Sequence, residues 1–344
     1  MKLNTALFTV LLCGTAMPAY SGAAQAGNAE AAAAAVSAAG QQTDKAAAKN
    51  ATANASAAKS AQAAKAAKQE TDKKQTAGNP ALQPSEKIYT DGGLLHHPFF
   101  GMPISTEAAK TEYSALKNGE YLEYDVYLGP TRVGSAWLFC DGIVQIGTHT
   151  AYHILSGVKS SSFVEMIYKV HDRNDSWFDT ETLYSYGYYK ELNEGHYFRN
   201  EWAIFDSENH RYFGKKLNRK RELSSFEGVL EIPVSDILSA MYKVRAMKMK
   251  KGDKIFMDVN TKKNWSMEAS VVRTEKIATI FGKKKCIVGE PKVGEEGIFV
   301  SKTGKRLFVW LTDDDDQIPV LLKAETFFGS VSAKLTKREL RYNK

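Results

Sequence analysis

Histidines at helical spacing are the first candidates for chemistry in this sequence, because two imidazoles on one helix face can share a metal ion. His149 and His153 are four residues apart, but the segment around them is rich in β-forming residues. In a strand their side chains would lie about 13 Å apart, too far to bind one ion together. His96 and His97 are neighbours before Pro98 in a predicted loop, where adjacent side chains seldom converge on one metal. We therefore expect no histidine-based metal site.

Two acidic segments could bind a cation. Asp172 to Asp179 superficially resembles a calcium-binding loop, but Trp177 stands where such a loop needs glycine, and Leu183 where it needs its closing carboxylate. Asp313 to Asp316 places four carboxylates between two apolar runs. A hairpin turn exposes such side chains to water at little cost, so the sequence favours a solvated turn over a cation site. We expect neither a metal nor another cofactor.

Catalytic motifs are not found in the sequence. It contains no Gly-x-Ser-x-Gly elbow, no Walker loop, no zinc-protease histidine pair and no cysteine–histidine nucleophile signature. Scattered carboxylates could still meet in space as an acid and a base, but no spacing selects one pair over another. We therefore expect a protein that is not an enzyme.

Aromatic residues offer a candidate binding surface. Tyr184, Tyr186 and Tyr188 alternate with small residues, so in a strand three rings would project from one face. Such a stripe is either a layer of the core, which we favour, or an exposed platform on which a glycan or an apolar ligand stacks.

The segment from Pro233 to Arg245 predicts an amphipathic helix, whose apolar stripe consists of Ile237, Leu238, Met241 and Val244. Its polar members, including Tyr242 and Arg245, could anchor the helix on a sheet, which is the interpretation that we favour. Alternatively the helix lines the mouth of a ligand cleft, and Tyr242 and Arg245 then belong to the binding site.

Cysteines add one structural question. Once a signal peptide is removed, Cys140 and Cys286 remain, an even number in a compartment that permits disulfides. They could form a bridge, but we favour two small buried hydrophobic residues, because each adjoins an apolar run. Cys13 does not fit a lipoprotein signal, because Leu12 stands where a small residue is needed.

The start of the chain predicts export. Lys2, the apolar run from Ala6 to Cys13 and the small residues after it form a cleavable signal peptide over residues 1–26. Residues 27–78 are an Ala/Lys-rich, low-complexity tether that cannot bury a core and is disordered or a fluctuating helix. No later apolar run is long enough to span a bilayer. We expect a periplasmic protein, with an extracellular location as the alternative.

Residues 79–105 form a transition rich in Pro and Gly, and a β-rich globular domain is predicted from residue 106 to residue 344. Its formal charge reflects 46 basic and 39 acidic side chains in the whole chain, a mild excess of +7 that does not indicate nucleic-acid binding. Basic groups recur along the domain, and we favour solvated loop ends over contacts with anionic lipid or polymer.

Short alternating runs dominate the domain. In Tyr121 to Leu128, for example, Leu122, Tyr124 and Val126 share one face. Further β-like runs follow at residues 132–139, 150–158, 163–170, 183–192, 196–205, 211–214, 254–259, 265–275, 284–288, 307–311 and 318–328. The spacing predicts a mainly β fold, an antiparallel meander that forms a curved sheet or open barrel with one covering helix.

The order of several motifs resembles a bacterial periplasmic family known as domain of unknown function 3108. The motifs are Gly119-Glu120-Tyr121-Leu122-Glu123-Tyr124-Asp125-Val126, Gly134-Ser135-Ala136, Ser235 to Arg245, the turn and strand from Gly282 to Cys286, Leu307-Phe308-Val309-Trp310-Leu311-Thr312-Asp313-Asp314, Ile318-Pro319-Val320 and Gly329-Ser330-Val331. The resemblance covers about residues 115 to 340 and implies an exported antiparallel β domain, with no catalytic residues to carry over.

Two functions remain open on these grounds. The first is a non-catalytic envelope protein, a binding module for a lipid-like or envelope-polymer ligand. The alternative is an assembly or scaffold protein that binds another envelope protein, and a hydrolase is less favoured than either.

Overall fold

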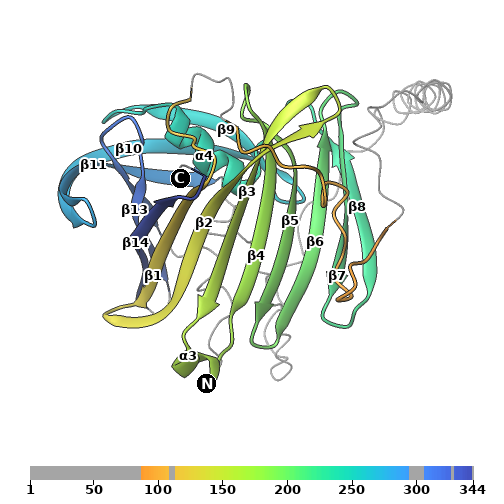
Figure 1. Ribbon diagram of the computed structural model, residues 1–344, viewed down its shortest axis with the longest axis horizontal. Coiled ribbons are helices and arrows are strands. Elements are labelled where there is room, and N and C mark those ends of the chain that lie inside the picture. Colours follow the sequence, from red (N-terminus) through yellow and green to blue (C-terminus); the bar gives the residue numbers. More distant parts are fainter. Residues whose placement is uncertain (1–86, 108–112, 294–305, 327–328, 343–344) are drawn as a thin grey trace, which may run out of the picture. The chain divides into compact units, whose positions relative to one another are not determined.

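The computed structural model describes residues 87–107, 113–293, 306–326 and 329–342. Within them the chain forms 14 strands and two helices (Figure 1). The elements are β1 (Glu120–Leu128), β2 (Thr131–Ile146), β3 (His149–Ser160), α3 (Ser162–Glu165), β4 (His171–Asp179), β5 (Ser185–Glu194), β6 (Tyr197–Asp206), β7 (Arg211–Asn218), β8 (Leu223–Val229), α4 (Ile237–Ala246), β9 (Lys254–Asn260), β10 (Asn264–Thr279), β11 (Gly282–Val293), β12 (Leu307–Thr312), β13 (Pro319–Thr326) and β14 (Gly329–Leu340). The signal peptide and the tether that the sequence predicts lie outside the described residues.

All the strands belong to one antiparallel sheet, whose order is β8-β7-β6-β5-β4-β3-β2-β1-β14-β13-β12-β11-β10-β9. The chain enters the sheet at its middle, where Tyr124 of β1 lies opposite Ala136 of β2 and Leu335 of β14. It meanders outward to β8, crosses through α4 to the opposite edge and returns from β9 to β14. The sheet is not closed, and the predicted antiparallel meander is confirmed.

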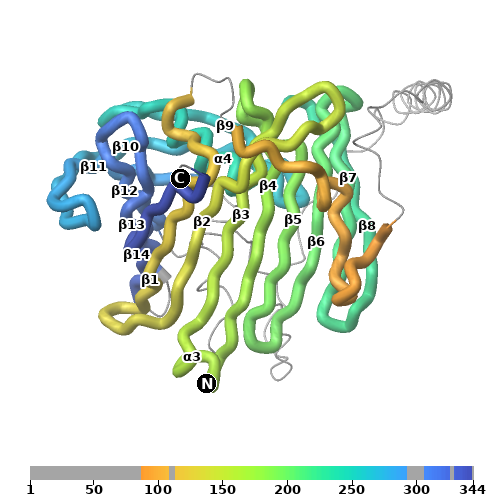
Figure 2. The backbone as a smooth tube through the Cα atoms, viewed as in Figure 1, coloured from red at the N-terminus to blue at the C-terminus, as the bar shows by residue number. Residues whose placement is uncertain are grey.

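Alternation along the strands gives the sheet two distinct faces. Leu122, Tyr124 and Val126 of β1 are buried on the concave face in the main core cluster, with Leu138 of β2 and Ile154 of β3. Figure 2 shows the sheet curving so that β9 and β10 run behind the strands near β3. Side chains of the concave face therefore pack against one another and against α4.

The segment between β8 and α4 spans the gap between the two edges of the sheet. Ser235 forms a parallel bridge with Val259 of β9, and its N–H donates to the carbonyl of Asp258 at 2.8 Å. Asn264 at the start of β10 donates from its side chain to the carbonyl of Val229 at 3.0 Å. These contacts bridge part of the gap between the two edges of the sheet. The edge strands β8 and β9 do not pair with each other, so the strands do not close a barrel.

A segment without regular structure covers the convex face. Leu95 and Phe99 are fully buried there against Trp177 of β4 and Trp202 of β6. The Leu95 N–H donates to the side-chain oxygen of Asn200 at 2.5 Å. The globular domain therefore begins before residue 106, where the sequence predicted its start, because prolines prevent regular structure but not burial.

One predicted strand is wrong. Residues 163–170 form the short helix α3 and the turn after it, and the next strand is β4, from His171 to Asp179. β4 includes the segment that resembled a calcium-binding loop, so Asp172 lies on one face of the sheet and Asp175 and Asp179 lie on the other. Among the described residues, no helix combines the length and the apolar character needed to cross a bilayer.

Candidate functional site

The N-terminal end of α4 is fixed to the sheet by the buried carboxylate of Asp236. This side chain accepts hydrogen bonds from the N–H groups of Leu238 and Ser239, at 2.8 and 3.2 Å, and so caps the helix. Its second oxygen accepts from the hydroxyls of Ser176 and Ser185, at 2.6 and 2.7 Å. Burial raises the pKa of Asp236 despite these four bonds. The cap therefore joins α4 to β4 and β5.

The C-terminal end of α4 is held by Arg245, which is fully buried. Its guanidinium lies 2.8 Å from the Glu120 carboxylate and donates to the carbonyls of Ala115 and Gln317, each at 3.2 Å. Arg338 of β14 binds the other Glu120 oxygen at 2.9 Å. Burial would lower the pKa of Arg245, but the charge and hydrogen bond of Glu120, together with Tyr242 and Tyr124, raise that pKa overall. Arg245 thus stays charged and ties α4 to β1.

The polar face of α4 consequently faces the sheet, while part of its apolar stripe remains uncovered. Ser239, Tyr242 and Arg245 are buried, whereas Met241 and Val244 are only partly buried. An amphipathic helix normally buries its apolar stripe and exposes its polar side. Here the polar side is buried against the sheet, and the apolar stripe borders a pocket.

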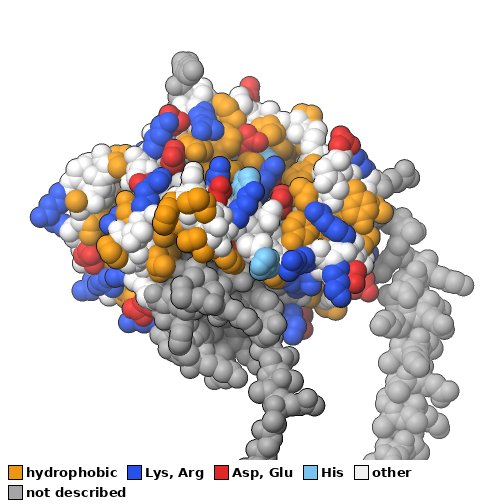
Figure 3. Space-filling view, turned by 90° about the horizontal axis from the view of Figure 1, so that it is seen from below, with side chains coloured by type: hydrophobic (Ala, Val, Ile, Leu, Met, Phe, Trp, Pro, Cys, Tyr) orange, Lys and Arg blue, Asp and Glu red, His pale blue; other side chains and the backbone are white. Residues whose placement is uncertain are grey.

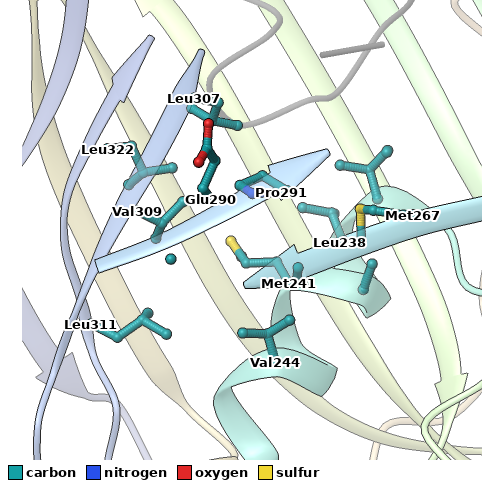
Figure 4. A pocket seen from close by; sticks show the side chains of 14 residues that line it. Leu238, Met241, Val244, Met267, Glu290, Pro291, Leu307, Val309, Leu311 and Leu322 are labelled. Atoms are coloured by element: carbon teal, nitrogen blue, oxygen red, sulfur yellow. The ribbon is translucent and has the colours of Figure 1, made fainter. Parts of the chain in front are cut away.

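That pocket lies between α4 and the half of the sheet that contains β10 to β13 (Figure 4). Figure 4 shows Leu238, Met241 and Val244 of α4 reaching toward Val309 and Leu311 of β12. The described residues that line it are Ile237, Leu238, Ala240, Met241, Val244, Met267, Ala269, Gly289, Glu290, Pro291, Leu307, Val309, Leu311 and Leu322. All of these residues except Glu290 are apolar or glycine, so the pocket offers dispersion contacts and almost no hydrogen bonds.

An ion pair between Glu290 and Arg306 lies at the wall of the pocket. Both Glu290 oxygens accept from the Arg306 guanidinium, at 2.6 and 2.8 Å, in a bidentate arrangement. The Arg306 hydrogen bond lowers the pKa of Glu290, which therefore remains ionised at neutral pH. Arg306 is half exposed and its guanidinium lies 4.6 Å from the centre of the Phe308 ring. A ligand with an anionic end could therefore reach Arg306 while its apolar part occupies the pocket.

The pocket has a volume of about 100 Å³. An apolar cavity of about 150 Å³ stays dry and takes up benzene, whereas pockets for drug-sized ligands measure about 300–1,000 Å³. The space therefore suits the end of a hydrocarbon chain or one ring, and not a whole large molecule.

A β-bulge divides the tyrosine stripe that the sequence predicted on one face. Trp177 of β4 lies opposite Gly187, and Phe178 lies opposite Ser185, so Tyr186 is an extra residue in β5. The extra residue reverses the alternation of side chains at this point in the strand.

As a result, the three tyrosines have different surroundings. Tyr186 packs on the convex face and donates to Asp179 at 2.7 Å, whereas Tyr188 is buried on the concave face. The Lys243 ammonium of α4 lies 3.5 Å from the centre of the Tyr184 ring. These three residues do not form one platform, and none of them lines the apolar pocket.

Tyr242 and Arg245 were the other two candidate binding residues. Both belong to α4 and are fully buried on its polar side, and the Arg245 guanidinium lies 5.1 Å from the centre of the Tyr242 ring. Their placement agrees with the anchoring role that the sequence favoured for the polar side of the helix. The apolar pocket beside α4 lies instead on the side of Met241 and Val244.

Cys140 and Cys286 are free and buried in this structure. The Cys140 sulfur lies 3.7 Å from the side-chain oxygen of Asn118, and the Cys286 sulfur lies 3.9 Å from the carbonyl of Lys284. Burial raises the pKa of both thiols, to about 11 for Cys286, so neither forms a thiolate readily at neutral pH.

The histidines separate into different environments. His149 lies near Glu208 at 3.6 Å, while His153 sits between Asp141 and Asp175 at 3.3 and 3.0 Å. Burial opposes protonation of His153, but hydrogen bonds to the two carboxylates raise its pKa. Within the described ranges, no three His, Cys, Asp or Glu side chains are arranged to hold a metal ion.

The acidic cluster between β12 and β13 is engaged by other side chains. Asp313 pairs with Lys285 at 2.6 Å, Asp315 with Lys248 at 2.8 Å, and Asp316 with Lys117 at 2.6 Å. Asp314 accepts from the Thr312 hydroxyl at 2.7 Å. Ion pairs therefore connect this turn to neighbouring segments of the chain.

Sequence reasoning missed most of the pocket. Leu238, Met241 and Val244 were recognised as an apolar stripe, which the favoured interpretation treated as a packing surface and the alternative as the mouth of a ligand cleft. Gly289 and Met267 gave no signal, because a glycine and an apolar residue in a β-like run are typical of any sheet. One useful signal was present in the sequence. The side of the helix opposite the apolar stripe is rich in polar residues, which indicates that this polar side could be the buried one.

Comparisons with known proteins found one family and weak similarity to solved structures. The model of the family described as "Protein of unknown function (DUF3108)" matches residues 123–336. A crystal structure of a beta-barrel-like protein of domain of unknown function DUF1849 from Brucella abortus aligns at 11% identity and a TM-score of 0.40, covering 65% of this chain and 98% of that one. A "putative lipoprotein" from Parabacteroides distasonis aligns at 9% identity and a TM-score of 0.30, covering 65% and 96%. No curated protein matches the chain.

Proposed function

The chain belongs to the DUF3108 family of proteins of unknown function, and from that premise we propose that it is a non-catalytic envelope protein that binds the hydrocarbon part of a lipid-like ligand beside α4. The ligand inserts its apolar end between α4 and strands β10 to β13. Its polar end remains near Arg306 at the wall of the pocket.

One observation carries this proposal. α4 is anchored to the sheet by hydrogen bonds of its N-cap residue Asp236 and of Arg245, and it leaves Met241 and Val244 partly uncovered beside an apolar pocket. Leaving apolar surface uncovered costs about 25 cal/mol per Å² relative to burying it. A ligand that covers this surface recovers that free energy. Its contacts replace the burial that closer packing of the helix would have given.

The chemistry of the lining supports binding rather than catalysis. Among the described residues of the pocket lining, Glu290 is the one titratable side chain, and Arg306 holds it ionised through two hydrogen bonds. A carboxylate in that state is a poor general acid, and its lone pairs are already engaged. Methionine side chains, here Met241 and Met267, adapt to apolar ligands of varied shape.

Export belongs to the same proposal. Residues 1–26 have the charged start, the short apolar run and the small residues of a cleavable signal peptide, and the Ala/Lys-rich stretch after them suits a tether. We place the mature protein in the periplasm, where lipid-like molecules and envelope polymers are available as ligands.

Native mass spectrometry of protein purified from cells tests the proposal. We expect a co-purified mass in the range of a lipid, released by organic solvent. A Gly289→Leu variant should lose it, because a Cβ at Gly289 meets no atom nearer than the Val309 carbonyl oxygen at 3.8 Å, so the longer side chain can fill the pocket.

Ala278→Leu is the matched control, since it adds the same side chain at an exposed position of β10. Retention of the ligand by Ala278→Leu and its loss from Gly289→Leu would support the proposal. Wild-type protein that carries no ligand and takes up no fatty acid in titration would overturn it.

A second candidate, a scaffold that binds another envelope protein, is favoured by the convex face of β1 and β2. Tyr121, Trp137 and Phe139 are partly exposed there, and the Arg341 guanidinium lies 3.7 Å from the centre of the Tyr121 ring. Partly exposed aromatic and arginine side chains are enriched in protein interfaces.

Crosslinking in cells separates the two candidates. A photoreactive amino acid at Trp137 should capture one abundant protein if the scaffold function holds. The same probe at Met241 should capture lipid if the pocket function holds. Protein adducts at Trp137 with no lipid adduct at Met241 would favour the second candidate.

A further inference from the structure

The connection between β3 and β4 presents three large apolar side chains to solvent. Phe163, Met166 and Ile167 are 71%, 76% and 75% exposed. They lie within and just after α3, at the tip of the longest-reaching connection at its end of the sheet (Figure 1). Exposed apolar residues scattered singly are ordinary on protein surfaces, but three together at one tip indicate a contact with something apolar.

The residues that flank the tip in sequence are held in place by hydrogen bonds. The Ser160 N–H donates to the carbonyl of Val170 at 3.0 Å, and the Gly195 N–H donates to the carbonyl of Lys169 at 2.6 Å. The Tyr168 hydroxyl donates to the carbonyl of Glu194 at 3.3 Å. The tip is therefore held out from the sheet in one direction by its own strands and by the β5–β6 turn.

Basic side chains accompany the apolar tip. Lys159 and Lys169 are exposed on the two arms of its hairpin, and Lys159 lies opposite His171 in the β3–β4 ladder. Glu165 is the acidic residue of the tip itself and is partly buried. The local balance is positive, which suits an anionic surface.

The same end of the sheet carries a second basic group. Alternate turns of a meander lie at one end of its strands, so the β7–β8 turn, with exposed Arg219, Lys220 and Arg221, shares this end with α3. Figure 3 views the molecule from that end and shows hydrophobic and basic side chains side by side on it.

A polar hollow of about 470 Å³ lies beside the β5–β6 turn at this end of the sheet. His196, Arg219 and Arg221 are among its lining residues, together with the carboxylate of Glu191. The Arg221 guanidinium lies 4.3 Å from the centre of the Phe198 ring. Cationic groups at an open hollow attract phosphate oxygens from outside the protein.

We propose that this end of the protein docks on the surface of a bilayer that contains anionic phospholipids, with Phe163, Met166 and Ile167 inserted among the acyl chains. Lys159, Lys169 and the β7–β8 turn then contact the phosphate groups. Apolar side chains that enter the interface while neighbouring lysines and arginines remain at headgroup level are the usual arrangement of surface-bound proteins.

The size of the apolar tip favours a bilayer over a protein partner. A stable protein interface buries about 800 Å² on each side, whereas this apolar surface is three side chains on one hairpin. A bilayer needs no complementary surface, so a small tip with a basic surround is sufficient. This docking goes beyond the pocket beside α4, because neither the tip nor its basic neighbours line that pocket.

Co-sedimentation of the full chain with mixed phosphatidylglycerol–phosphatidylcholine vesicles tests the docking. The variant Phe163→Ser/Met166→Ser/Ile167→Ser should bind at least about tenfold more weakly, since it removes the apolar contacts. Its control is Val229→Ser/Met247→Ser/Phe256→Ser, which replaces three side chains that are 67%, 50% and 68% exposed elsewhere. Circular dichroism spectra should be the same for both variants and the wild type.

A charge variant completes the experiment. Lys159→Ala/Lys169→Ala should weaken binding to the mixed vesicles by about tenfold, and added salt should reduce this difference. Wild-type protein that does not sediment with the vesicles, or a tip variant that binds as well as the control, would overturn the proposal. Loss of vesicle binding in the tip variant together with an intact pocket ligand would show that docking and ligand binding are separate properties.

Discussion

The two faces of the sheet are covered by different means. On the concave face, α4 is anchored by polar groups at both ends, Asp236 and Arg245, and an apolar pocket remains beside it. On the convex face, residues 87–105 are held mainly by buried rings. Trp177 is stacked there between His97 and His153, with ring centres 4.3 and 4.8 Å apart.

The difference shows which cover forms a site. Rings on the convex face fill the space between the segment and the strands, so that cover completes a core. The anchors of α4 fix the position of the helix without using its apolar side, so that cover can leave room for a ligand. A cover that is held by polar ends can keep a pocket open, whereas one held by apolar packing closes over it.

The largest effect is expected at the polar anchor. Arg245→Ala would leave the Glu120 carboxylate buried beside one remaining arginine and should lower the free energy of unfolding by about 3–5 kcal/mol. Urea unfolding followed by tryptophan fluorescence measures this loss. Lys337→Ala, which removes the ammonium of an exposed pair with Glu339, should leave the midpoint nearly unchanged. Equal midpoints for both variants would contradict the anchor role.

The next effect is expected under the convex cover. Phe99→Ala should cost about 3 kcal/mol, because it removes a buried ring and leaves a cavity against Trp177. The same unfolding measurement applies, with Phe163→Ala as the control, since that ring is exposed. A loss below about 1 kcal/mol for Phe99→Ala would mean that residues 87–105 are not part of the stable core.

Lowering the pH should reduce the free energy of unfolding through His97, which lies in the segment that covers the convex face. Burial lowers the pKa of His97 to about 3 from an ordinary value of about 6.5. Between those two values the unfolded chain binds a proton that the folded chain does not, so stability falls as pH drops below about 6.5. At pH 5 the loss from this group alone is about 2 kcal/mol relative to pH 7.

His97→Asn should remove that part of the pH dependence while it retains an acceptor for the Phe99 N–H, which donates to the His97 ring at 3.0 Å. Unfolding free energies of wild type and variant at several pH values give the comparison. His153 acts in the opposite sense, because its pKa is raised and its stabilisation is present below about 6.5 and lost at higher pH. Parallel pH profiles for wild type and His97→Asn would contradict this assignment.

The smallest effect on stability is expected in the pocket. Met241→Ala should change the free energy of unfolding by less than about 1 kcal/mol in ligand-free protein, because the side chain is already only partly buried. Fatty-acid titration should nevertheless show weaker binding than in wild type. A loss as large as that of Phe99→Ala would mean that the pocket is an ordinary part of the core.

Much of the fold could be predicted from local patterns. Alternation in β1 and the apolar stripe of α4 depend on neighbouring residues, and β1 occurs where the sequence placed it. α4 begins at Ile237, four residues after the predicted start at Pro233, because Asp236 caps it. The segment 163–170 is also rich in β-forming residues, but Phe163, Met166 and Ile167 lie at an exposed tip rather than on a sheet. Pattern alone cannot distinguish an apolar residue that packs in a core from one that faces solvent.

The candidate site was harder to predict because its determinants are distant in sequence. Asp236 accepts a hydrogen bond from Ser176, 60 residues away, and Arg245 donates one to Glu120, 125 residues away. These partners decide which side of α4 is buried, and no local rule identifies them. The bulge at Tyr186 is similar, since it depends on the register between two strands and not on the residues of one.

β1 lies at the centre of the sheet, and its two neighbours come from opposite ends of the domain. Glu120 pairs with Leu340, so one side of β1 has no partner until the last strand has been made. Contacts between residues so distant in sequence form slowly, and an unpaired strand edge invites association with other chains in the meantime. Folding should therefore finish at the seam between β1 and β14. A chain that stops before β14 would expose two bare edges in the middle of the sheet, where the intact protein has none.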